Sequence, residues 1–281
     1  MKRNIGAVII DTYQDKKMPL LAIEHISKLD FINQIYFLSD SAIDSQATNI
    51  KIPKINSAKE YSDIVLFGLM EYIREDYILI FQWDGFSTHP ESWIANFLNY
   101  DYVGAPIYLP NGEIWIGNGG FSLRSRRLLE LTLKLKSEIL EISADEPAED
   151  QIICTHAKKI LENHGTIFAP IDTAAQFSYQ NAPQRNISFG FHGVHNFPFF
   201  LSEDVLLSVN REIFLRAAHP QFIIEFFANC IQQGMIDLFR SCLINFSKND
   251  NLYKALLWDK KRNPNSNLLD FIVRNNVVPI N

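Results

Sequence analysis

The chain has 281 residues, 47% of them hydrophobic and 21% charged, and it carries a formal net charge of −6 at pH 7. This length and apolar content can bury a substantial core, in one large domain or in one domain with an appendage. The negative net charge excludes a general electrostatic attraction to nucleic acid or acidic lipid. We therefore expect no nucleic-acid partner, and a phosphate-bearing small molecule would need a local site.

Cysteines and apolar runs bear on the compartment. The three cysteines, Cys154, Cys230 and Cys242, are odd in number and lack metal-site spacing, which favours buried thiols in a reducing compartment. The apolar run near the N-terminus is too short for a signal peptide, and no later run reaches the roughly 18 apolar residues of a membrane span. We expect a cytoplasmic protein without a transmembrane segment, which can still work at the periphery of a membrane.

The first 125 residues alternate between short strand-like runs and helical patterns, which is typical of an α/β sheet. The strand candidates are rich in Ile, Val, Phe and Tyr and cover residues 5–11, 34–40, 77–84, 102–107 and 114–117. The predicted helices cover residues 57–73, a short stretch from Pro90, and residues 126–142.

The texture of the sequence changes after Pro198. Helical patterns then repeat and strand signals are few, so we expect domains of 1–200 and 201–281. The acid pair Glu203 and Asp204 lies in this part, and because it follows a Ser and precedes apolar residues it predicts a helix start.

The hexapeptide IFQWDG, residues 80–85, ends a hydrophobic strand with an acid and a glycine. Ligands of open α/β sheets bind beyond the carboxyl ends of the strands, where Asp84 would lie. An ordinary turn is the alternative, because Asp before Gly favours one.

The stretch WIGNGGFSLRSRR, residues 115–127, combines three glycines, an Asn and three arginines. It lacks the third glycine of a dinucleotide-binding loop and the lysine of a P-loop, so it is no phosphate cradle. Gly117, Gly119 and Gly120 would let the main chain lie against a ligand, and Asn118 adds an amide that donates and accepts hydrogen bonds. A sugar-binding surface and a tight hairpin are the two alternatives. The arginines either meet phosphate or solvate the start of the next helix.

Two further motifs carry titratable side chains. Glu149 and Asp150 begin an apolar helical run, where they either stabilise the first turn or supply a general base. His192 and His195 lie between glycines and aromatic residues, and such a pair either binds metal or is satisfied within the core.

Taken in order, these motifs resemble the GT-A-fold glycosyltransferases, which use nucleotide-sugar donors, and more closely a bacterial group assigned to glycosyl transfer. The shared motifs FQ-x-D, DYVGAP, GNGGFSLRS, ED and FGFH lie here at residues 81–84, 101–106, 117–125, 149–150 and 189–192. The resemblance covers about residues 5–200. It implies a GT-A-like, Rossmann-type mixed α/β sheet flanked by helices, with the remaining residues as a helical C-terminal extension.

The resemblance also implies a divalent metal, Mn²⁺ or Mg²⁺. In the family a DxD element at a strand end contacts the ribose and the metal on the diphosphate. Here the element reads Gln82, Trp83 and Asp84, so an amide replaces the first acid. Asp84 keeps the role of a metal ligand, Gln82 is expected to hydrogen-bond the sugar or the ribose, and His192 matches a late second metal ligand.

The remaining roles follow from the same resemblance. For an inverting transfer, Glu149 or Asp150 matches the base that takes the proton of the acceptor hydroxyl, and we prefer Asp150. Asn118, Gly119 and Gly120 are expected to contact the donor sugar and the acceptor.

The nucleotide is expected at the ends of the first two strands. Asp11, Thr12 and Asp40 are the residues expected to contact it, and a UDP-sugar is the favoured donor. The leading hypothesis is therefore a glycosyltransferase that moves a sugar to a glycan or other hydroxyl acceptor in bacterial surface glycan synthesis. A noncatalytic module that binds a sugar or nucleotide through a degenerate DxD element is the alternative. A nucleotidyltransferase is disfavoured, because no glycine-rich loop follows the first strand.

Overall fold

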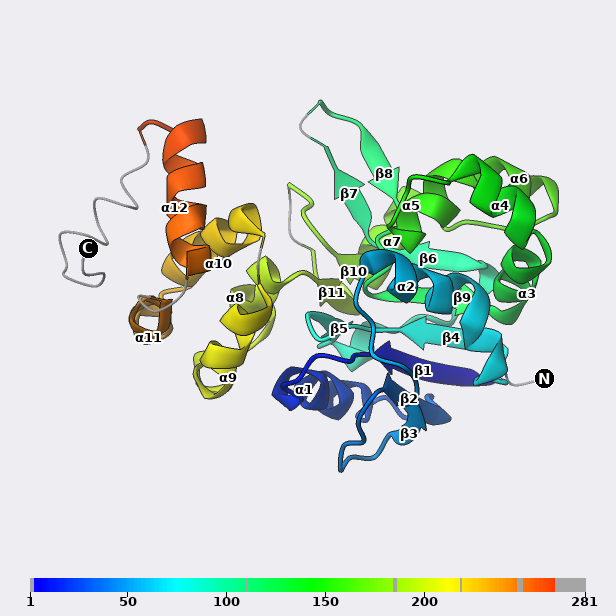
Figure 1. Ribbon diagram of the computed structural model, residues 1–281, viewed down its shortest axis with the longest axis horizontal. Coiled ribbons are helices and arrows are strands. Elements are labelled where there is room, and N and C mark those ends of the chain that lie inside the picture. Colours follow the sequence, from blue (N-terminus) through cyan, green and yellow to red (C-terminus); the bar gives the residue numbers. More distant parts are fainter. Residues whose placement is uncertain (1–2, 110, 184–185, 218, 247–249, 266–281) are drawn as a thin grey trace. The chain divides into compact units, whose positions relative to one another are not determined.

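The computed structural model describes residues 3–109, 111–183, 186–217, 219–246 and 250–265. The chain divides into two compact units, Met1–His192 and Gly193–Asn281. The first unit is α/β and the second is helical (Figure 1). The predicted boundary near residue 200 lies within the second unit, and the expectation of two domains that meet there stays a prediction.

A mixed sheet of six strands organises the first unit. In spatial order these strands are β3 (Thr48–Lys51), β2 (Gln34–Ser39), β1 (Ile5–Ile10), β4 (Tyr77–Ile80), β9 (Ser122–Ser125) and β6 (Tyr102–Gly104). The first four run parallel, whereas β9 lies antiparallel between β4 and β6. This arrangement, with helices on both sides of the sheet, confirms the predicted α/β class.

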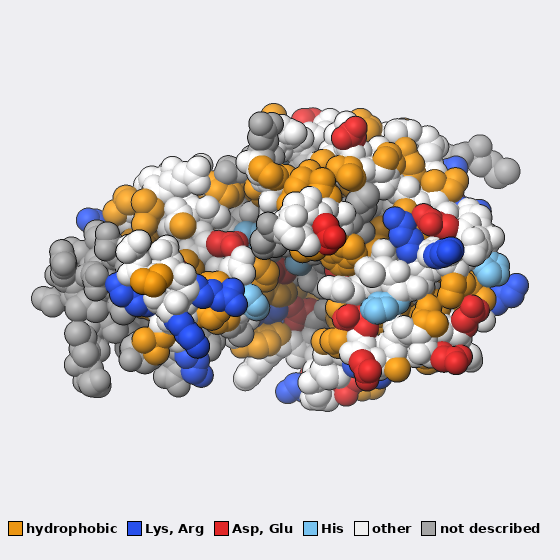
Figure 2. Space-filling view, turned by 90° about the horizontal axis from the view of Figure 1, so that it is seen from above, with side chains coloured by type: hydrophobic (Ala, Val, Ile, Leu, Met, Phe, Trp, Pro, Cys, Tyr) orange, Lys and Arg blue, Asp and Glu red, His pale blue; other side chains and the backbone are white. Residues whose placement is uncertain are grey.

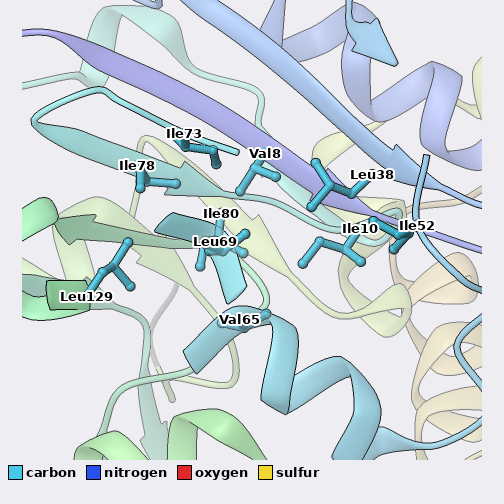
Figure 3. Close-up of a cluster of buried hydrophobic side chains, with 10 residues drawn as sticks. All are labelled: Val8, Ile10, Leu38, Ile52, Val65, Leu69, Ile73, Ile78, Ile80 and Leu129. Atoms are coloured by element: carbon cyan, nitrogen blue, oxygen red, sulfur yellow. The ribbon is translucent and has the colours of Figure 1, made fainter. Parts of the chain in front are cut away.

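The central strand β1 is buried at every position, so its two faces both need helical cover. On one face Val8 and Ile10 pack against Val65, Leu69 and Leu129, which come from the helices that follow β3 and β9 (Figure 3). The helix α1 (Lys17–Ile26) lies on the opposite side of β1 from α2 (Ala58–Asp63) in Figure 1. Each such buried aliphatic side chain contributes about 1.5 to 3 kcal/mol to folding.

The helix predicted over residues 57–73 forms, but it changes its winding twice. It begins as α2, continues as a π-helical segment (Ile64–Gly68) and ends as a 3₁₀ turn (Leu69–Glu71). The Ser57 hydroxyl accepts the Glu60 backbone N–H at 3.1 Å, as the predicted cap requires. The Glu60 carboxylate reaches back to the Asn56 N–H at 2.7 Å, one residue earlier than in the usual capping box.

The other helices of the first unit are short. They are α3 (Arg126–Lys134), α4 (Lys136–Ile142), α5 (Glu149–Gln151), a second π-helical segment (Ile152–His156), α6 (Lys158–Asn163) and α7 (Ile171–Phe177). The helix predicted over 126–142 is divided into α3 and α4 at Leu135, whose backbone leaves the helical region. The helix predicted from Pro90 is a 3₁₀ turn, Pro90–Ser92, followed by a second one over Ala95–Asn99.

Two small sheets complete the first unit. One contains β10 (Ser178–Tyr179), β11 (Gly190–His192) and β5 (Gly85–Ser87), and the other pairs β7 (Pro106–Tyr108) with β8 (Ile114–Ile116). The single strand predicted over 102–107 is therefore two strands, β6 and β7, in different sheets.

The second unit is built from helices, as the sequence predicts. They are α8 (Phe197–Phe200), α9 (Glu203–Arg216), α10 (Pro220–Gln232), α11 (Ile236–Phe246) and α12 (Asp250–Arg262), preceded by a 3₁₀ turn (Val194–Asn196). Ser202 caps α9 by accepting the Val205 N–H at 3.4 Å, which confirms the predicted helix start at Glu203 and Asp204.

The surface and the helix lengths add two observations. Figure 2 shows acidic, basic and apolar side chains interspersed over the visible face of the first unit. In the part of the chain that the structure describes, no helix is long and apolar enough to cross a membrane.

Candidate functional site

The predicted FQ-x-D motif forms a tight turn at the carboxyl end of β4. Gln82 and Gly85 exchange two backbone hydrogen bonds, of 2.9 and 3.1 Å, so Trp83 and Asp84 occupy the corner. Both alternatives for Asp84 therefore hold for its position, because it lies in a turn and also beyond the carboxyl end of a parallel strand.

Strand pairing brings His192 to this turn from far along the chain. The strand β11 runs antiparallel to β5, with His192 opposite Gly85. The His192 Nε2 atom consequently lies 3.7 Å from Asp84 Oδ1. This carboxylate oxygen is buried and has no hydrogen-bond partner among the described residues. The two predicted metal ligands thus lie side by side.

The imidazole ring of His192 is surrounded by oxygen atoms. Its Nδ1 lies 2.9 Å from Gln180 Oε1, and its Nε2 lies 3.2 Å from Gln82 Oε1. If Nδ1 donates to Gln180, the neutral ring presents an Nε2 lone pair to the oxygens of Gln82 and Asp84, where no hydrogen bond can form without a further proton. A proton on Nε2 or a cation between these atoms would satisfy the arrangement.

Mn²⁺ or Mg²⁺ fits these donors in part. An imidazole nitrogen and hard carboxylate oxygens suit both ions. Among the described residues no group of three or more His, Cys, Asp and Glu side chains could hold a metal. The chain would therefore supply Asp84 and His192, and a bound ion would take further ligands from substrate oxygens and water, as Mg²⁺ commonly does.

The glycine-rich segment packs between the titratable side chains. A Cβ atom on Gly120 would lie 2.1 Å from His192 Nε2, and one on Gly119 would lie 2.0 Å from Glu149 Oε1. Neither position has room for a side chain. A Cβ atom on Gly117, whose φ is +133°, would lie 2.2 Å from Cys154 Sγ. The glycines allow the close approach that the sequence predicts, although the atoms that approach them here belong to the chain itself.

The same segment is not a hairpin turn. The hairpin is formed upstream by β7 and β8, and residues 117–121 connect β8 to β9. Asn118 is buried and its Oδ1 accepts the Gly120 N–H at 3.0 Å, which fixes the conformation of the glycine pair. Contacts of Asn118, Gly119 and Gly120 with a donor or acceptor stay a prediction.

The two acids of the ED pair have different surroundings. Glu149 is 5% exposed and lies against the fully buried Arg124, with an Nη2–Oε1 distance of 2.8 Å. Asp150 is half-buried, and its Oδ2 accepts the Gly119 N–H at 3.0 Å. Glu149 is therefore engaged in a buried ion pair, whereas Asp150 keeps part of its surface accessible.

Burial and charge act on Glu149 in opposite directions. Burial raises the pKa of Glu149 to about 7, although the Arg124 guanidinium acts to lower it, and the Asp150 carboxylate adds to the rise. Arg124 itself stays charged, and its guanidinium lies 5.0 Å from the centre of the Tyr102 ring. Arg124 is thus neither a surface residue nor a phosphate contact in this structure, contrary to both alternatives from the sequence.

The other two arginines of the stretch are also paired. Arg127 forms a bidentate hydrogen bond with Asp101, and Arg126 pairs with Glu130 one helical turn on, at 2.9 Å. Burial acts to raise the pKa of Asp101, but the hydrogen bonds from Arg127 and Ser125 outweigh it and lower that pKa.

The consecutive glycines bring both groups of side chains together. Gly119 contacts Glu149 and Asp150, and Gly120 contacts His192 and Gln82. Two successive Cα atoms are only about 3.8 Å apart across a trans peptide. The ED pair, Glu149 and Asp150, and the pair of Asp84 and His192 therefore converge on one short piece of main chain.

Residues 44–192 match the model of a family described as "Protein of unknown function (DUF5672)". The chain belongs to the DUF5672 family. The matched residues of this DUF5672 protein include Asp84, the consecutive glycines 119 and 120, and the ED pair at 149–150. They end at His192, where the first compact unit also ends.

No curated protein matches the DUF5672 chain. Among solved structures it is similar to a glycosyltransferase involved in the glycosylation of the major capsid of PBCV-1, with 10% identity and a TM-score of 0.46 over 67% of this chain and 92% of that one. The glycosyltransferase GlyE of Streptococcus pneumoniae TIGR4 is 11% identical, with a TM-score of 0.44 over 83% of this chain and 64% of that one. The galactosyltransferase LgtC is 14% identical, with a TM-score of 0.39 over 67% and 86%.

The predicted nucleotide contacts of the DUF5672 protein lie together at the same edge of the sheet. Asp11 and Thr12 follow β1, and Asp40 follows β2. Lys16 Nζ lies 3.8 Å from Asp11 Oδ1 and 3.9 Å from Asp40 Oδ1. The Thr12 hydroxyl accepts the Ile55 N–H at 3.0 Å. Their proximity agrees with parallel strands that end at one edge, and contact with a nucleotide stays a prediction.

Sequence reasoning missed three residues that contact the predicted site: Lys16, Tyr61 and Gln180. The Tyr61 hydroxyl accepts a 2.8 Å hydrogen bond from Gln82 Nε2, and burial, with the Glu149 charge adding to it, raises the pKa of Tyr61. Gln180 belongs to no motif, and only the pairing of β10 with β11 reveals its approach to His192. Of the three, Lys16 alone could have been found from the sequence, because it is a basic residue shortly after the acid that follows the first strand.

The predicted histidine pair is divided between the two units. His192 ends β11 of the first unit, whereas His195 belongs to the second. The His195 ring stacks on Phe222 with a centroid distance of 4.8 Å. Within the helical unit His195 is thus a buried, packed histidine, which is the simpler of the two alternatives.

Proposed function

We propose that this protein is a glycosyltransferase that moves a sugar from a nucleotide-diphosphate donor to a hydroxyl acceptor, with inversion and with the help of a metal. One observation carries the proposal. The half-buried Asp150 and the Asp84–His192 pair converge on the consecutive glycines 119 and 120, at the edge where the parallel strands end.

In this proposal Asp150 is the general base. Its carboxylate takes the proton of the acceptor hydroxyl while that oxygen bonds to the anomeric carbon, and the bond from this carbon to the diphosphate oxygen breaks on the opposite face. The Gly119 N–H donates to Oδ2 and the Gln151 N–H donates to Oδ1 at 2.8 Å, so both hydrogen bonds hold the carboxylate in place and favour its ionised form. Asp150 is only half-buried, which leaves part of this residue accessible. Glu149 is less suited, because Arg124 occupies it within the core.

Asp84 and His192 are the residues that would hold a divalent cation. When bound, such an ion neutralises the negative charge that develops on the departing diphosphate. Gln180 orients the His192 ring through Nδ1, and Tyr61 holds Gln82 by accepting a hydrogen bond from its Nε2. The amide at position 82 thus serves the geometry of the site where the first acid of a DxD element would stand.

The donor end is assigned by the same reasoning. Asp11, Thr12 and Asp40 would meet the nucleotide, and a UDP-sugar is the first donor to test. Synthesis of a bacterial surface glycan in the cytoplasm completes the proposal and rests on the sequence resemblance.

The test is release of nucleoside diphosphate from a panel of nucleotide sugars, with Mn²⁺ and with glycan acceptors or water. The wild-type protein should turn over at least one donor, and the Asp150→Asn variant should lose roughly 10²- to 10⁴-fold in rate, the usual share of a general base.

Asp204→Asn is the matched control. Asp204 is also a first-turn acid that directly follows a Glu, and it lies exposed at the start of α9. It should keep wild-type turnover. Donor binding without turnover by the wild type, across all donors and acceptors, would instead support the noncatalytic module.

A further inference from the structure

A pocket of about 280 Å³ lies next to the site just described. It is lined by Pro106, Tyr108, Ala175, Ser178, Tyr179, Gln180, Ala182, Pro183 and Asn186. Its volume is close to the lower end of the roughly 300 to 1,000 Å³ typical of small-molecule sites. It lies entirely within the first compact unit.

Hydrogen bonds hold two walls of this pocket in place. The Asn181 side chain accepts the Tyr108 N–H at 2.9 Å and donates to the Tyr108 carbonyl at 2.9 Å, which ties β7 to the segment after β10. The Tyr179 hydroxyl donates to the Ala182 carbonyl at 3.1 Å. These hydrogen bonds fix the two walls within the protein itself, which reduces the entropic cost of ordering them on binding.

The described residues of the lining share an uncharged chemistry. None of the described residues that line the pocket carries a charge at neutral pH. Two tyrosine rings and the Pro and Ala side chains offer apolar surface, while two amides and a serine offer hydrogen bonds. The Ser178 hydroxyl is fully buried and has no hydrogen-bond partner among the described residues. A neutral ring with apolar faces and hydroxyl edges, which is a sugar, matches this lining.

Gln180 connects the pocket to the reaction centre. It lines the pocket, and its Oε1 lies 2.9 Å from His192 Nδ1, on the ring whose Nε2 faces Asp84. Along the small sheet the order is β10, β11, β5, and β5 follows the Asp84 turn. The pocket thus lies on the β10 side of His192, whereas the predicted nucleotide contacts lie at the ends of β1 and β2.

We propose that this pocket is the acceptor subsite and that it binds a neutral sugar unit of the acceptor. That the bound sugar belongs to the acceptor rests on the proposed function. That the ligand is a sugar rests on the pocket alone. Among the described residues that line the pocket, a carboxylate or phosphate on this sugar unit would meet no cation.

Binding is tested first, without any turnover. Lactose, maltose and cellobiose are added to the full-length protein with glucuronate as the charged comparison, and ligand-observed NMR records saturation transfer. At least one neutral disaccharide should bind the wild type, and glucuronate should not. Ala175→Phe, which fills the pocket from α7, should weaken that binding by roughly tenfold or more. Tyr108→Ala, which removes a wall instead, should weaken it too.

The control for an added phenyl group is Ala144→Phe, at an exposed position after α4 that is not part of the pocket. It should bind the disaccharides as the wild type does. If no neutral disaccharide binds, or if Ala175→Phe and Tyr108→Ala bind as well as the wild type, the pocket is not a sugar site.

A second arm separates acceptor from donor. Ala175→Phe should raise the KM for a disaccharide acceptor by roughly tenfold or more and leave hydrolysis of the donor by water within about twofold. A matching loss in donor hydrolysis would assign the pocket to the donor sugar and overturn the acceptor assignment. The wild type could also bind a disaccharide without any turnover, with the binding lost in Ala175→Phe. That result would support the sugar site and contradict the proposed transferase activity.

Discussion

At the scale of single residues, the stability of the fold depends strongly on the buried pair of Arg124 and Glu149. Removing Arg124 would leave the Glu149 carboxylate uncompensated in the core, which costs about 3 to 5 kcal/mol. We expect Arg124→Met to lower the free energy of unfolding by this amount in urea titrations at pH 8. The double variant Arg124→Met with Glu149→Met should recover most of the loss, because apolar side chains of similar volume can replace a buried pair.

The exposed pair of Arg126 and Glu130 is the control for that experiment. Arg126→Met removes the same charge from a surface pair and should cost about 1 kcal/mol or less. Equal losses for Arg124→Met and Arg126→Met would show that the buried pair has no special weight.

The raised pKa of Glu149 predicts a pH dependence of stability. Because burial raises this pKa from 4.5 to about 7, the folded protein holds the proton more tightly than the unfolded chain does. The contribution of Glu149 is fully present below pH 4.5 and is lost as the pH rises through 7. The total loss is on the order of 3 kcal/mol.

The Glu149→Gln variant isolates this contribution. Its free energy of unfolding, minus that of the wild type, should rise between pH 5 and pH 8. The difference is needed because His25, whose pKa is lowered to about 4 chiefly by burial, has the opposite effect over part of this range in both proteins. A difference that is flat with pH would mean that Glu149 stays ionised throughout.

The glycine pair predicts a local intolerance to side chains. Gly120→Ala would place a methyl group against His192 Nε2, so the ring or the segment must shift, at a cost of about 1 to 3 kcal/mol. We expect lower thermal stability and at least a tenfold loss of donor hydrolysis. Gly68→Ala is the control, because its Cβ would meet its neighbours at 3.7 Å or more. Equal behaviour of the two variants would refute the packing role.

At this scale the sequence predicted which residues form the site better than it predicted the partner of each residue. The sequence could name Asp84 and His192 as partners, and the structure does bring them together. It preferred Asp150 to Glu149 by resemblance alone and gave no physical reason, because the partner of Glu149 is Arg124, which the sequence presents as one of three arginines before a helix. The two acids are distinguished by the buried ion pair between Arg124 of β9 and Glu149 of α5.

At the scale of elements, the strands with apolar runs were predictable and the polar ones were not. The predictions for β1, β2, β4 and β8 agree with the structure to within a few residues. The strand β9 was missed, because its sequence SLRS holds a single apolar residue, and its burial depends on hydrogen bonds and an ion pair. One predicted long helix changes its winding to a π-helical segment, and the other is divided where the backbone of Leu135 leaves the helical region. Hydrophobic spacing reveals neither change.

Two helix caps give a prediction at this scale. Ser57 and Ser125 both accept a backbone N–H at the start of a helix, at 3.1 and 3.0 Å. Ser125 also donates to the buried Asp101 at 2.5 Å. In urea titrations Ser57→Ala should cost about 0.5 to 2 kcal/mol, and Ser125→Ala should cost about 1 kcal/mol more. Equal costs would mean that the second hydrogen bond adds nothing.

At the scale of the whole molecule, ligand binding and folding are linked. If Asp84 and His192 hold Mn²⁺ with a nucleoside diphosphate, then adding Mn²⁺ and UDP at 100 times their Kd should stabilise the protein by about 2.7 kcal/mol. The melting temperature should rise by several degrees in the wild type and in Asp204→Asn. Asp84→Asn should lose most of this rise, and chelation of the metal should reverse it. An undiminished rise in Asp84→Asn would remove that residue from the metal site.

The change from an α/β to a helical texture was also visible in the sequence at this scale. Patterns after Pro198 predict helices, and α9 to α12 bear this out within the described residues. The compact units separate at His192, because residues 194–200 already form a 3₁₀ turn and a short helix. Aromatic runs such as FPFF carry no periodic signal that would assign them to one unit.

The two π-helical segments predict a difference in helix length among related sequences. One begins three residues after Tyr61 and the other two residues after Asp150, and such segments correspond to a single residue inserted into an α-helix. In a lineage that has lost the site, we expect a one-residue deletion in each of these helices. Such a gap would mark the loss more sharply than any substitution, because removing one residue turns everything before it by about 100° relative to everything after it.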